Sequence, residues 1–315
     1  MEKLNIPVGI SDFREIRENG YYYIDKTFLI YELLKTPATK VTLITRPRRF
    51  GKTLGMSMLA DFFDIRKESS SLFEGLDISE KTNICNEWLN QYPVIFLSLK
   101  DIDGLTFKDA YGQLVAQIAD LYKEYTYLLE CAEIDEDDKK IFLDLKAGKA
   151  DKVQVSRSFS TLMKMLQIYY QKPVILLLDE YDVPVAKASN HGYYNEMLDV
   201  MKGIMSTALK DNQALRFAVI TGCLKIAKES IFTGTNNFVS DTIRDSRYNE
   251  YFGFTDEEVD ELFERYEHNN ENAQISRQDL RIWYDGYTTK SGERIYNPRS
   301  VVLALTNNNI GNYWT

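Results

Sequence analysis

The fold of this chain is decided by one stretch, Thr45-Arg46-Pro47-Arg48-Arg49-Phe50-Gly51-Lys52-Thr53-Leu54. A short apolar run at residues 41–45 leads into it and predicts a buried strand, and apolar residues at helical spacing follow it. A loop that joins a strand to a helix points backbone N–H groups at an anion, and the helix dipole favours negative charge there. The stretch therefore predicts a phosphate-binding loop (P-loop).

Lys52 and Thr53 are the residues of this loop whose side chains are expected to contact the nucleotide and its metal ion. Lys52 is expected to reach the β- and γ-phosphates of a nucleotide, and the Thr53 hydroxyl to ligate Mg²⁺. Arg46 stands where the usual pattern G-x-x-x-x-G-K-[ST] has its first glycine. Four cations within residues 46–52 of an acidic protein favour phosphate binding over a basic surface turn. The residues expected to bind the cofactor are Arg46, Pro47, Arg48, Arg49, Phe50, Gly51, Lys52, Thr53 and Leu54.

A second apolar run, residues 174–178, is followed by Asp179-Glu180-Tyr181-Asp182. A continuous apolar run is typical of a parallel strand buried on both faces, and ligands bind at the carboxyl edge of such sheets. In this Walker B pattern we expect Asp179 to hold Mg²⁺ through water and Glu180 to act as general base on the attacking water. Two roles stay open for Asp182, the outer shell of the metal and the cap of the next helix, and we favour the cap.

A third apolar run, residues 217–220, ends in Thr221-Gly222. Some nucleotide hydrolases carry an extra strand between the P-loop strand and the Walker B strand, and it ends in a polar residue that senses the γ-phosphate. Thr221 fits that role, and we count it with Lys52 and Glu180 as catalytic. Lys225 and Lys228 lie just beyond, where contact with phosphate and exposure to solvent are equally open.

Two further runs complete the predicted sheet, a strong one at residues 94–99 and a weaker one at residues 238–243. Between the strands, residues 106–125, 158–169 and 194–210 carry apolar residues three and four positions apart, as helices do. Strands that alternate with helices imply a layered α/β fold with right-handed crossovers. The expected fold is a P-loop NTPase, a three-layer parallel sheet of the additional-strand type.

The character of the sequence changes near residue 250. Thr255-Asp256-Glu257-Glu258 is a capping box before an amphipathic run, and Ser276 is expected to cap a second helix. A turn-rich stretch and a last apolar helix at residues 301–305 follow. The order helix, helix, hairpin, helix predicts a small winged-helix-like lid. Residues 1–250 would then form the ATPase core and residues 251–315 the lid.

The composition disfavours several other kinds of site. With 38 Lys+Arg against 47 Asp+Glu, the net charge of −9 does not support nucleic-acid binding, although a local basic patch can bind phosphate. The two histidines and three cysteines are scattered, which disfavours zinc and a Ser-His-Asp site. Scattered cysteines also indicate reduced thiols and a cytoplasmic location. No apolar run approaches the roughly 20 residues that span a membrane.

An acidic run at residues 133–138 holds five carboxylates in six residues. A calcium loop spaces its oxygen ligands along the chain, and this run lacks that spacing. We expect a solvated loop rather than a calcium site.

Phosphoryl transfer also needs a cation beside the transferred group in the transition state. Five arginines are candidates, namely Arg48, Arg49, Arg244, Arg247 and Arg299. The two loop arginines are nearest to the phosphate site in sequence, but an interpretation in which they face a partner or nucleic acid stays open. The sequence does not choose among the five.

Six motifs together are similar to those of a known family. They are Ile6-Pro7-Val8-Gly9-Ile10-Ser11-Asp12-Phe13, Tyr23-Ile24-Asp25-Lys26-Thr27, Ile44-Thr45-Arg46-Pro47-Arg48-Arg49-Phe50-Gly51-Lys52-Thr53, Leu72-Phe73-Glu74-Gly75-Leu76, Leu178-Asp179-Glu180-Tyr181-Asp182 and Tyr296-Asn297-Pro298-Arg299-Ser300. On these residues the whole chain resembles the bacterial AAA-ATPase-like family, whose members usually carry a C-terminal PD-(D/E)XK nuclease-like domain. The resemblance implies a P-loop ATPase of the additional-strand type, and Arg46 matches the family's own variant of the loop.

The resemblance also implies roles for single residues. The phosphate and Mg²⁺ contacts would be Lys52 and Thr53, and the Walker B acids Asp179 and Glu180. From their position, we expect residues 7–13 and 23–27 to cover the adenine. The alternative for Asp25 and Lys26 is a structural ion pair.

The nuclease-like domain of the family is not expected in this chain. A nuclease motif would be an apolar strand with Asp followed by Glu-x-Lys, and we find no convincing case. The sequence ends at Thr315, directly after the predicted lid, where the family would continue. We expect a shortened form of a longer protein, with a naturally short member as the alternative.

Together these features predict a regulatory module that binds Mg-ATP and is expected to hydrolyse it. Its lid would move on hydrolysis and control an attached or partner effector such as a nuclease, and a homo-oligomer is among the expected partners. The alternative is a non-hydrolysing nucleotide-dependent switch or interaction scaffold. A third interpretation, a metabolite kinase, is disfavoured by Asp-Glu on a buried strand with a polar sensor strand downstream.

Overall fold

The computed structural model describes residues 5–226, 231–232, 237–245, 247–270, 272–290 and 292–313. Within these residues the core is a sheet of five strands. They are β1 (Val41–Thr45), β2 (Val94–Ser98), β3 (Val174–Asp179), β4 (Leu215–Gly222) and β5 (Phe238–Thr242). All are parallel and lie in the order β2-β3-β4-β1-β5, so the predicted strands are confirmed. Because β4 lies between β1 and β3, the sheet is of the additional-strand type.

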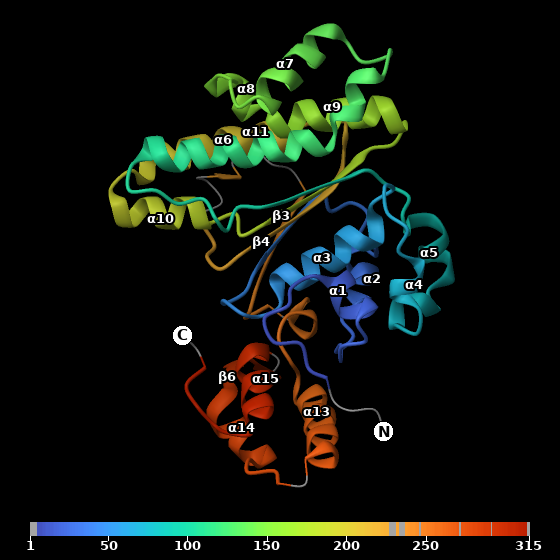
Figure 1. Ribbon diagram of the computed structural model, residues 1–315, viewed down its shortest axis with the longest axis vertical. Coiled ribbons are helices and arrows are strands. Elements are labelled where there is room, and N and C mark those ends of the chain that lie inside the picture. The colour runs from blue at the N-terminus through green and yellow to red at the C-terminus, as the bar shows by residue number, and fades with distance from the viewer. Residues whose placement is uncertain are drawn as a thin grey trace.

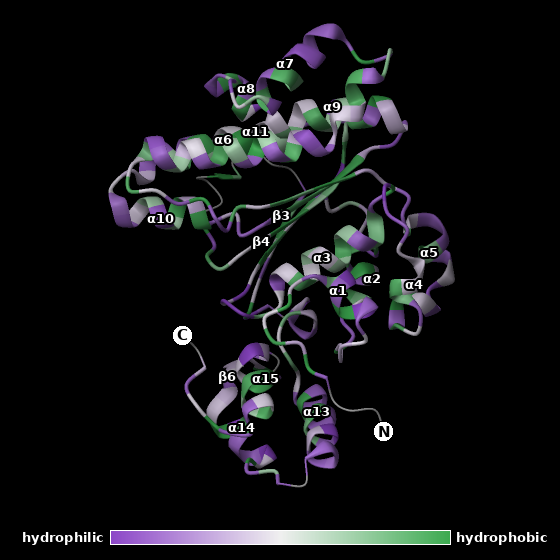
Figure 2. Ribbon diagram, in the orientation of Figure 1, coloured by the Kyte–Doolittle hydropathy of each residue, from purple (hydrophilic) through white to green (hydrophobic). Residues whose placement is uncertain are grey.

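Both faces of the sheet are apolar, since the strands carry continuous apolar runs instead of alternating ones. Successive side chains of a strand point to opposite faces. In β3, Leu176 and Leu178 belong to one buried cluster, whereas Ile175 and Leu177 belong to the other. Figure 2 shows apolar stretches of β3 and β4 between two layers of helices. Each such leucine or isoleucine stabilises the fold by about 1.5–3 kcal/mol when fully buried.

Helices cover the two faces and make the three predicted layers (Figure 1). One layer holds α6 (Phe107–Glu124), α7 (Glu136–Lys146), α8 (Lys152–Ser156), α9 (Ser158–Tyr170), α10 (Val183–His191) and α11 (Tyr194–Leu209). The other holds α1 (Phe13–Glu18), α2 (Phe28–Leu34), α3 (Lys52–Phe63), α4 (Ser70–Phe73) and α5 (Thr82–Trp88). Short 3-10 helices lie at η1 (Asp77–Glu80), η2 (Thr126–Glu130) and η3 (Asn249–Tyr251).

The acidic run at residues 133–138 was expected to be a loop, and that expectation is wrong for most of it. Asp135 is the N-cap of α7, and its side chain accepts a hydrogen bond from the backbone N–H of Asp137. The next three acidic residues form the first turn of the helix. Carboxylates are favoured there because the first N–H groups of a helix lack partners and its dipole is positive at that end.

After residue 250, Tyr251 and Phe252 still pack in the buried cluster of the core, and we call the residues that follow, 254–313, the lid. Its elements are α13 (Asp256–Asn269), α14 (Arg277–Tyr284), β6 (Asp285–Thr288), β7 (Arg294–Tyr296) and α15 (Pro298–Asn307), in the predicted order of helix, helix, hairpin, helix. The capping box of Thr255 and Glu258 opens α13, and Ser276 caps α14. The lid has its own buried cluster, drawn from its three helices and β7.

The N-terminal segment, residues 5–27, joins the lid to the core (Figure 1). Phe13 is buried in the core under α3, whereas Ile6, Tyr22 and Ile24 pack against the cluster of the lid. One chain segment therefore contacts both units. Among the described helices, none combines the length and the apolar character that crossing a membrane requires.

Candidate functional site

The predicted P-loop curls around the amine of Lys52. Lys52 is the first residue of α3, and its Nζ donates to the backbone carbonyls of Arg46 (3.1 Å) and Pro47 (3.0 Å). Arg49 and Gly51 have φ values of 70° and 76°, in the left-handed region that lets the chain turn sharply. The loop thus encloses a cation whose side chain is only 3% exposed.

Arg46 takes part in the loop through its backbone, while its side chain points to the neighbouring strand. The guanidinium forms an ion pair with Asp241 of β5 and also donates to the Thr45 carbonyl at 3.0 Å. Its centre lies 5.7 Å from the centroid of the Phe252 ring. The residue is 1% exposed. An arginine at the first glycine position is therefore accommodated because β5 supplies a buried carboxylate for it.

Asp179 joins two hydroxyl groups at the carboxyl edge of the sheet. Its Oδ2 accepts a hydrogen bond from Thr53 Oγ1 at 2.7 Å, and its Oδ1 accepts one from Thr221 Oγ1. The structure thus brings together three site residues predicted on three separate elements. A hydroxyl and a carboxylate are oxygen donors that suit Mg²⁺, which usually keeps water and phosphate oxygens as its other ligands.

Glu180 is held in an unusual conformation beside Lys52. Its φ is 55°, which costs a non-glycine residue about 1–3 kcal/mol and is common at functional sites. Its Oε1 lies 3.5 Å from Lys52 Nζ. Burial raises the pKa of this carboxyl, Lys52 opposes the rise, and Asp179 adds to it. A carboxylate with a raised pKa next to a lysine suits a general base.

Cys223 is a site residue that sequence reasoning missed. Its Sγ accepts from Lys52 Nζ at 3.3 Å and donates toward Glu180 Oε2 at 3.7 Å. Burial raises the pKa of its thiol. No motif marks this position, although its place two residues after Thr221 is a usable signal.

The favoured role of Asp182 as a helix cap is wrong. Asp182 occupies the N-cap position of α10, but its side chain makes no capping hydrogen bond. The carboxylate accepts instead from the backbone N–H groups of Cys223 and Leu224, which follow β4. These N–H groups are nearer partners because β3 and β4 are neighbours in the sheet.

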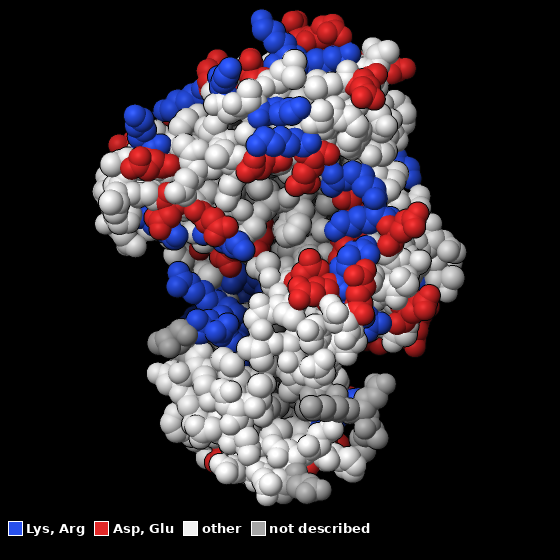
Figure 3. Space-filling view, in the orientation of Figure 1, with Lys and Arg blue, Asp and Glu red and all other residues white. Residues whose placement is uncertain are grey.

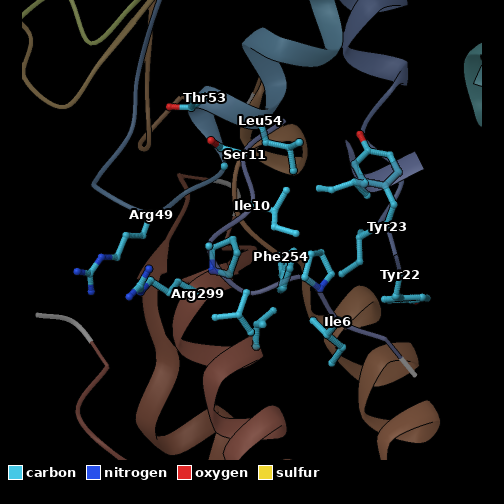
Figure 4. Close-up of a pocket in the computed structure, with 18 of the residues that line it drawn as sticks. Ile6, Ile10, Ser11, Tyr22, Tyr23, Arg49, Thr53, Leu54, Phe254 and Arg299 are labelled. Atoms are coloured by element: carbon cyan, nitrogen blue, oxygen red, sulfur yellow. The ribbon is translucent and has the colours of Figure 1, made fainter. Parts of the chain in front are cut away.

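An apolar cavity of 270 Å³ opens onto the P-loop. Its walls come from the N-terminal segment, the start of α3 and the lid, as Figure 4 shows. Its apolar lining residues are Ile6, Pro7, Val8, Ile10, Ile16, Ile24, Leu54, Phe254, Leu262, Pro298 and Val302. Lys52, Thr53 and Glu180 line its other end. A flat apolar base next to a polyphosphate would match this arrangement.

The N-terminal segment lines the cavity at residues 6–11 and 22–24, which overlap the ranges 7–13 and 23–27 expected to cover the adenine. Asp25 and Lys26 do not pair with each other. Lys26 forms an ion pair with Glu258 of α13, whereas Asp25 accepts from the backbone N–H of Asp77 in the core at 2.7 Å. The segment is therefore fastened to both the lid and the core.

Two of the five candidate arginines, Arg49 and Arg299, line the cavity. Figure 4 draws both guanidinium groups on the side of the cavity away from Tyr22 and Tyr23. Arg49 donates to the carbonyl of Tyr313 at 2.9 Å. In Figure 3, Lys and Arg side chains gather at the indentation between core and lid.

The other three arginines do not line the cavity. Arg247 donates to Thr36 Oγ1 and lies over the ring of Tyr248 at 5.0 Å. Arg48 and Arg244 are exposed, as is Lys225, and Lys228 lies outside the described residues.

Two contacts join the lid to the P-loop. Asn297 Nδ2 donates to the carbonyl of Arg48 at 3.3 Å. The Phe50 ring is fully buried and meets the Tyr287 ring edge-on, with centroids 5.1 Å apart. The conformation of loop residues 48–50 is therefore linked to the position of the lid.

Comparison with known proteins agrees with this geometry. Residues 7–232 match a protein-family model described as "Predicted AAA-ATPase". A curated relative, the "Uncharacterized protein in vnfD 5'region" of Azotobacter chroococcum mcd 1, is 30% identical over 317 residues, covering 100% of this chain and 54% of the relative. The chain thus spans about half the length of that relative. Because the family model covers the P-loop, Asp179, Glu180 and Thr221, the chain belongs to the AAA-ATPase-like family.

Proposed function

We propose that this chain binds Mg-ATP and hydrolyses it, and that hydrolysis moves the lid to control an attached or partner effector. One observation carries the proposal. Lys52 Nζ lies inside the loop and 3.5 Å from Glu180 Oε1, at the mouth of an apolar cavity large enough for a base. The proposal gives Lys52 the role of phosphate-binding cation, Glu180 that of general base and the cavity that of the base-binding chamber.

In this proposal the adenine enters the apolar chamber and the triphosphate lies along the loop. When ATP binds, Lys52 gives up its hydrogen bonds to the loop carbonyls and its ion pair with Glu180, and it contacts phosphate oxygens instead. Glu180, released from Lys52, accepts a proton from the attacking water. The hydroxyl of Thr221 turns from Asp179 to the γ-phosphate and so responds to its presence.

Thr53 and Asp179 are the residues that would hold Mg²⁺. The ion, when bound, neutralises charge on the phosphate oxygens. Arg49 and Arg299 would stabilise the charge that develops on the transferred group, one from the loop and one from the lid. Since Arg299 lies on α15, loss of the γ-phosphate removes an attraction that holds the lid.

The effector and the assembly belong to this proposal as well. Members of the family usually carry a nuclease-like domain, and the curated relative is nearly twice as long as this chain. We expect the effector to be such a domain, in the same chain or in a partner, and a homo-oligomer is the other expected partner.

A second function, a nucleotide-dependent switch without turnover, is favoured by the contacts between the lid and loop residues 48–50. These contacts connect nucleotide binding to the lid directly, so that a change of lid position does not require hydrolysis.

The two functions are separated by Lys52→Ala and Glu180→Gln, measured by calorimetric ATP titration and by phosphate release. Lys52→Ala should lose nucleotide binding under both. Glu180→Gln should keep binding and lose phosphate release under the first function only. Lys187→Ala is the matched control, because Lys187 forms its ion pair with Asp103 away from the cavity (2.8 Å). Wild-type phosphate release no faster than that of Glu180→Gln would refute hydrolysis and leave the switch.

A further inference from the structure

The two residues that follow Glu180 bind the segment that follows Thr221. Asp182 Oδ1 accepts from the backbone N–H of Cys223 at 3.1 Å, and its Oδ2 from that of Leu224 at 2.8 Å. The Tyr181 hydroxyl donates to the Leu224 carbonyl at 2.9 Å and accepts from the backbone N–H of Ile226 at 3.0 Å. Two side chains therefore satisfy four backbone groups of residues 223–226.

This contact is tightly packed and shielded from water. Tyr181 is 0% exposed and Asp182 is 2% exposed. A Cβ atom on Gly222 would lie 2.4 Å from Asp182 Oδ1 and 2.7 Å from the Tyr181 ring, so only glycine fits there. A buried carboxylate is costly unless it is hydrogen-bonded, and here backbone N–H groups supply the bonds.

The segment held in this way contacts the proposed chemistry directly. Cys223 lies between Lys52 and Glu180, and the Thr221 hydroxyl donates to Asp179. The backbone N–H of Tyr181 donates to the Thr221 carbonyl at 3.0 Å. Glu180, with its φ of 55°, lies in the chain between Asp179 and Tyr181, and both of these residues are hydrogen-bonded to Thr221. A strained backbone conformation persists only where its neighbours hold it.

We propose that Tyr181 and Asp182 are positioning residues, which clamp residues 222–226 and thereby hold the Glu180 carboxylate where it activates water. The proposal rests on the proposed hydrolysis of ATP. Neither side chain lines the nucleotide cavity. The clamp therefore affects the chemical step more than it affects nucleotide affinity.

The test compares Asp182→Asn and Tyr181→Phe with wild type. Asn keeps the shape of Asp but places an NH₂ group where an acceptor is needed, and Phe removes only the hydroxyl. We expect kcat to fall on the order of 10- to 100-fold in each variant, as small misplacements of catalytic groups do. ADP affinity, measured by calorimetry, should stay within about two-fold of wild type. Unchanged kcat in both variants, or an equal loss of affinity and kcat, would overturn the proposal.

Tyr193→Phe is the matched control, because Tyr193 is also a buried tyrosine whose hydroxyl binds a loop carbonyl, that of Gly104 at 2.6 Å. It should leave kcat unchanged. Tyr181→Phe is the milder of the two test variants, so it keeps the test decisive if Asp182→Asn does not fold.

Amide hydrogen exchange tests the clamp without any turnover. At least one of the amides of Cys223 and Leu224 should exchange faster in Asp182→Asn, because asparagine keeps only one of the two acceptor oxygens. The amide of Ile226 should exchange faster in Tyr181→Phe, because phenylalanine has no acceptor. Unchanged exchange overturns the clamp itself. If wild type releases no phosphate, the proposed function fails and the catalytic role fails with it. If wild type turns over and both variants match it, only the positioning role fails.

Discussion

The guanidinium of Arg46 is buried against the carboxylate of Asp241, which lies on the strand next to the one that leads into the P-loop. The carbonyl of the same arginine accepts from Lys52 at 3.1 Å. Arg46 therefore connects the edge strand β5 to Lys52, and it does so from the position that other P-loops give to a glycine.

Asp241→Ala should lower the free energy of unfolding by about 3–5 kcal/mol, because it leaves the buried Arg46 without its counter-charge. Urea denaturation measures this loss. The double variant Arg46→Met, Asp241→Leu should recover most of it, since no unpaired charge remains. A single variant as stable as wild type would show that the ion pair is not what fixes Arg46.

The acid limb of the hydrolysis rate should lie above pH 4.5, the ordinary pKa of a glutamate. Burial raises the pKa of Glu180, and a general base is active only as the carboxylate. Activity is thus present above the raised pKa and is lost as the pH falls through it. The measurement is kcat/KM for ATP against pH at constant ionic strength. A limb at or below the ordinary value contradicts the proposed base.

The raised pKa of Glu180 also makes the free energy of unfolding depend on pH, in the opposite direction to the hydrolysis rate. The folded chain binds this proton more tightly than the unfolded chain, so the stability that Glu180 contributes is present at low pH and is lost as the pH rises through its raised pKa. Glu180→Gln should therefore be more stable than wild type at neutral pH, and the difference should shrink in acid. Thermal unfolding across the pH range checks this, and a neutral-pH loss of stability would contradict it.

Thr53→Val should remove the gain in ADP affinity that Mg²⁺ provides, because valine keeps the shape of threonine and lacks the ligating hydroxyl. Titrations with Mg²⁺ and with EDTA give the gain for each protein. Thr207→Val on α11 removes a hydroxyl far from the P-loop and serves as control. An equal Mg²⁺ gain in Thr53→Val and wild type would exclude Thr53 as a ligand.

Arg299→Ala should lower kcat by about 10- to 100-fold, as loss of a charge that stabilises a transition state does. Arg247→Ala should have no such effect, since Arg247 binds Thr36 and lies outside the cavity lining. Single-turnover phosphate release compares the two. Equal rates in both variants would remove Arg299 from the list of transition-state cations.

The strands and the helix starts were predictable because they depend on residues that are neighbours in the sequence. Continuous apolar runs specified the five strands, and the capping box at Thr255 specified the start of α13. Strand-end residues such as Asp179 and Thr221 meet because the carboxyl ends of parallel strands share one edge. The prediction of a loop at residues 133–138 was wrong for a local reason too, since carboxylates are as favourable in the first turn of a helix as in a loop.

The partners of single side chains were not predictable in the same way. Arg46 and Asp241 are 195 residues apart in the chain and meet only because β5 lies beside β1. Asp182 binds the N–H groups after β4 because β3 and β4 are neighbours. The pairing of β4 with β1 on its other side brings Cys223 to Lys52. Strand order decides these contacts. The sequence predicted that an extra strand lies between β1 and β3, but it did not predict the place of β5 beside β1 or the side-chain partners that the strand order brings together.

The contacts between the lid and loop residues 48–50 make the two a thermodynamically coupled pair. Coupling free energy is reciprocal. If nucleotide binding strengthens the association of the lid with the core by some factor, then association of the lid with the core raises nucleotide affinity by the same factor. Any macromolecule that draws the lid away must then lower nucleotide affinity, and nucleotide must weaken that macromolecule's binding to the same extent. Under the proposed function, the contact between the rings of Phe50 and Tyr287 would thus make nucleotide and a lid-binding macromolecule competitors without any direct contact between them.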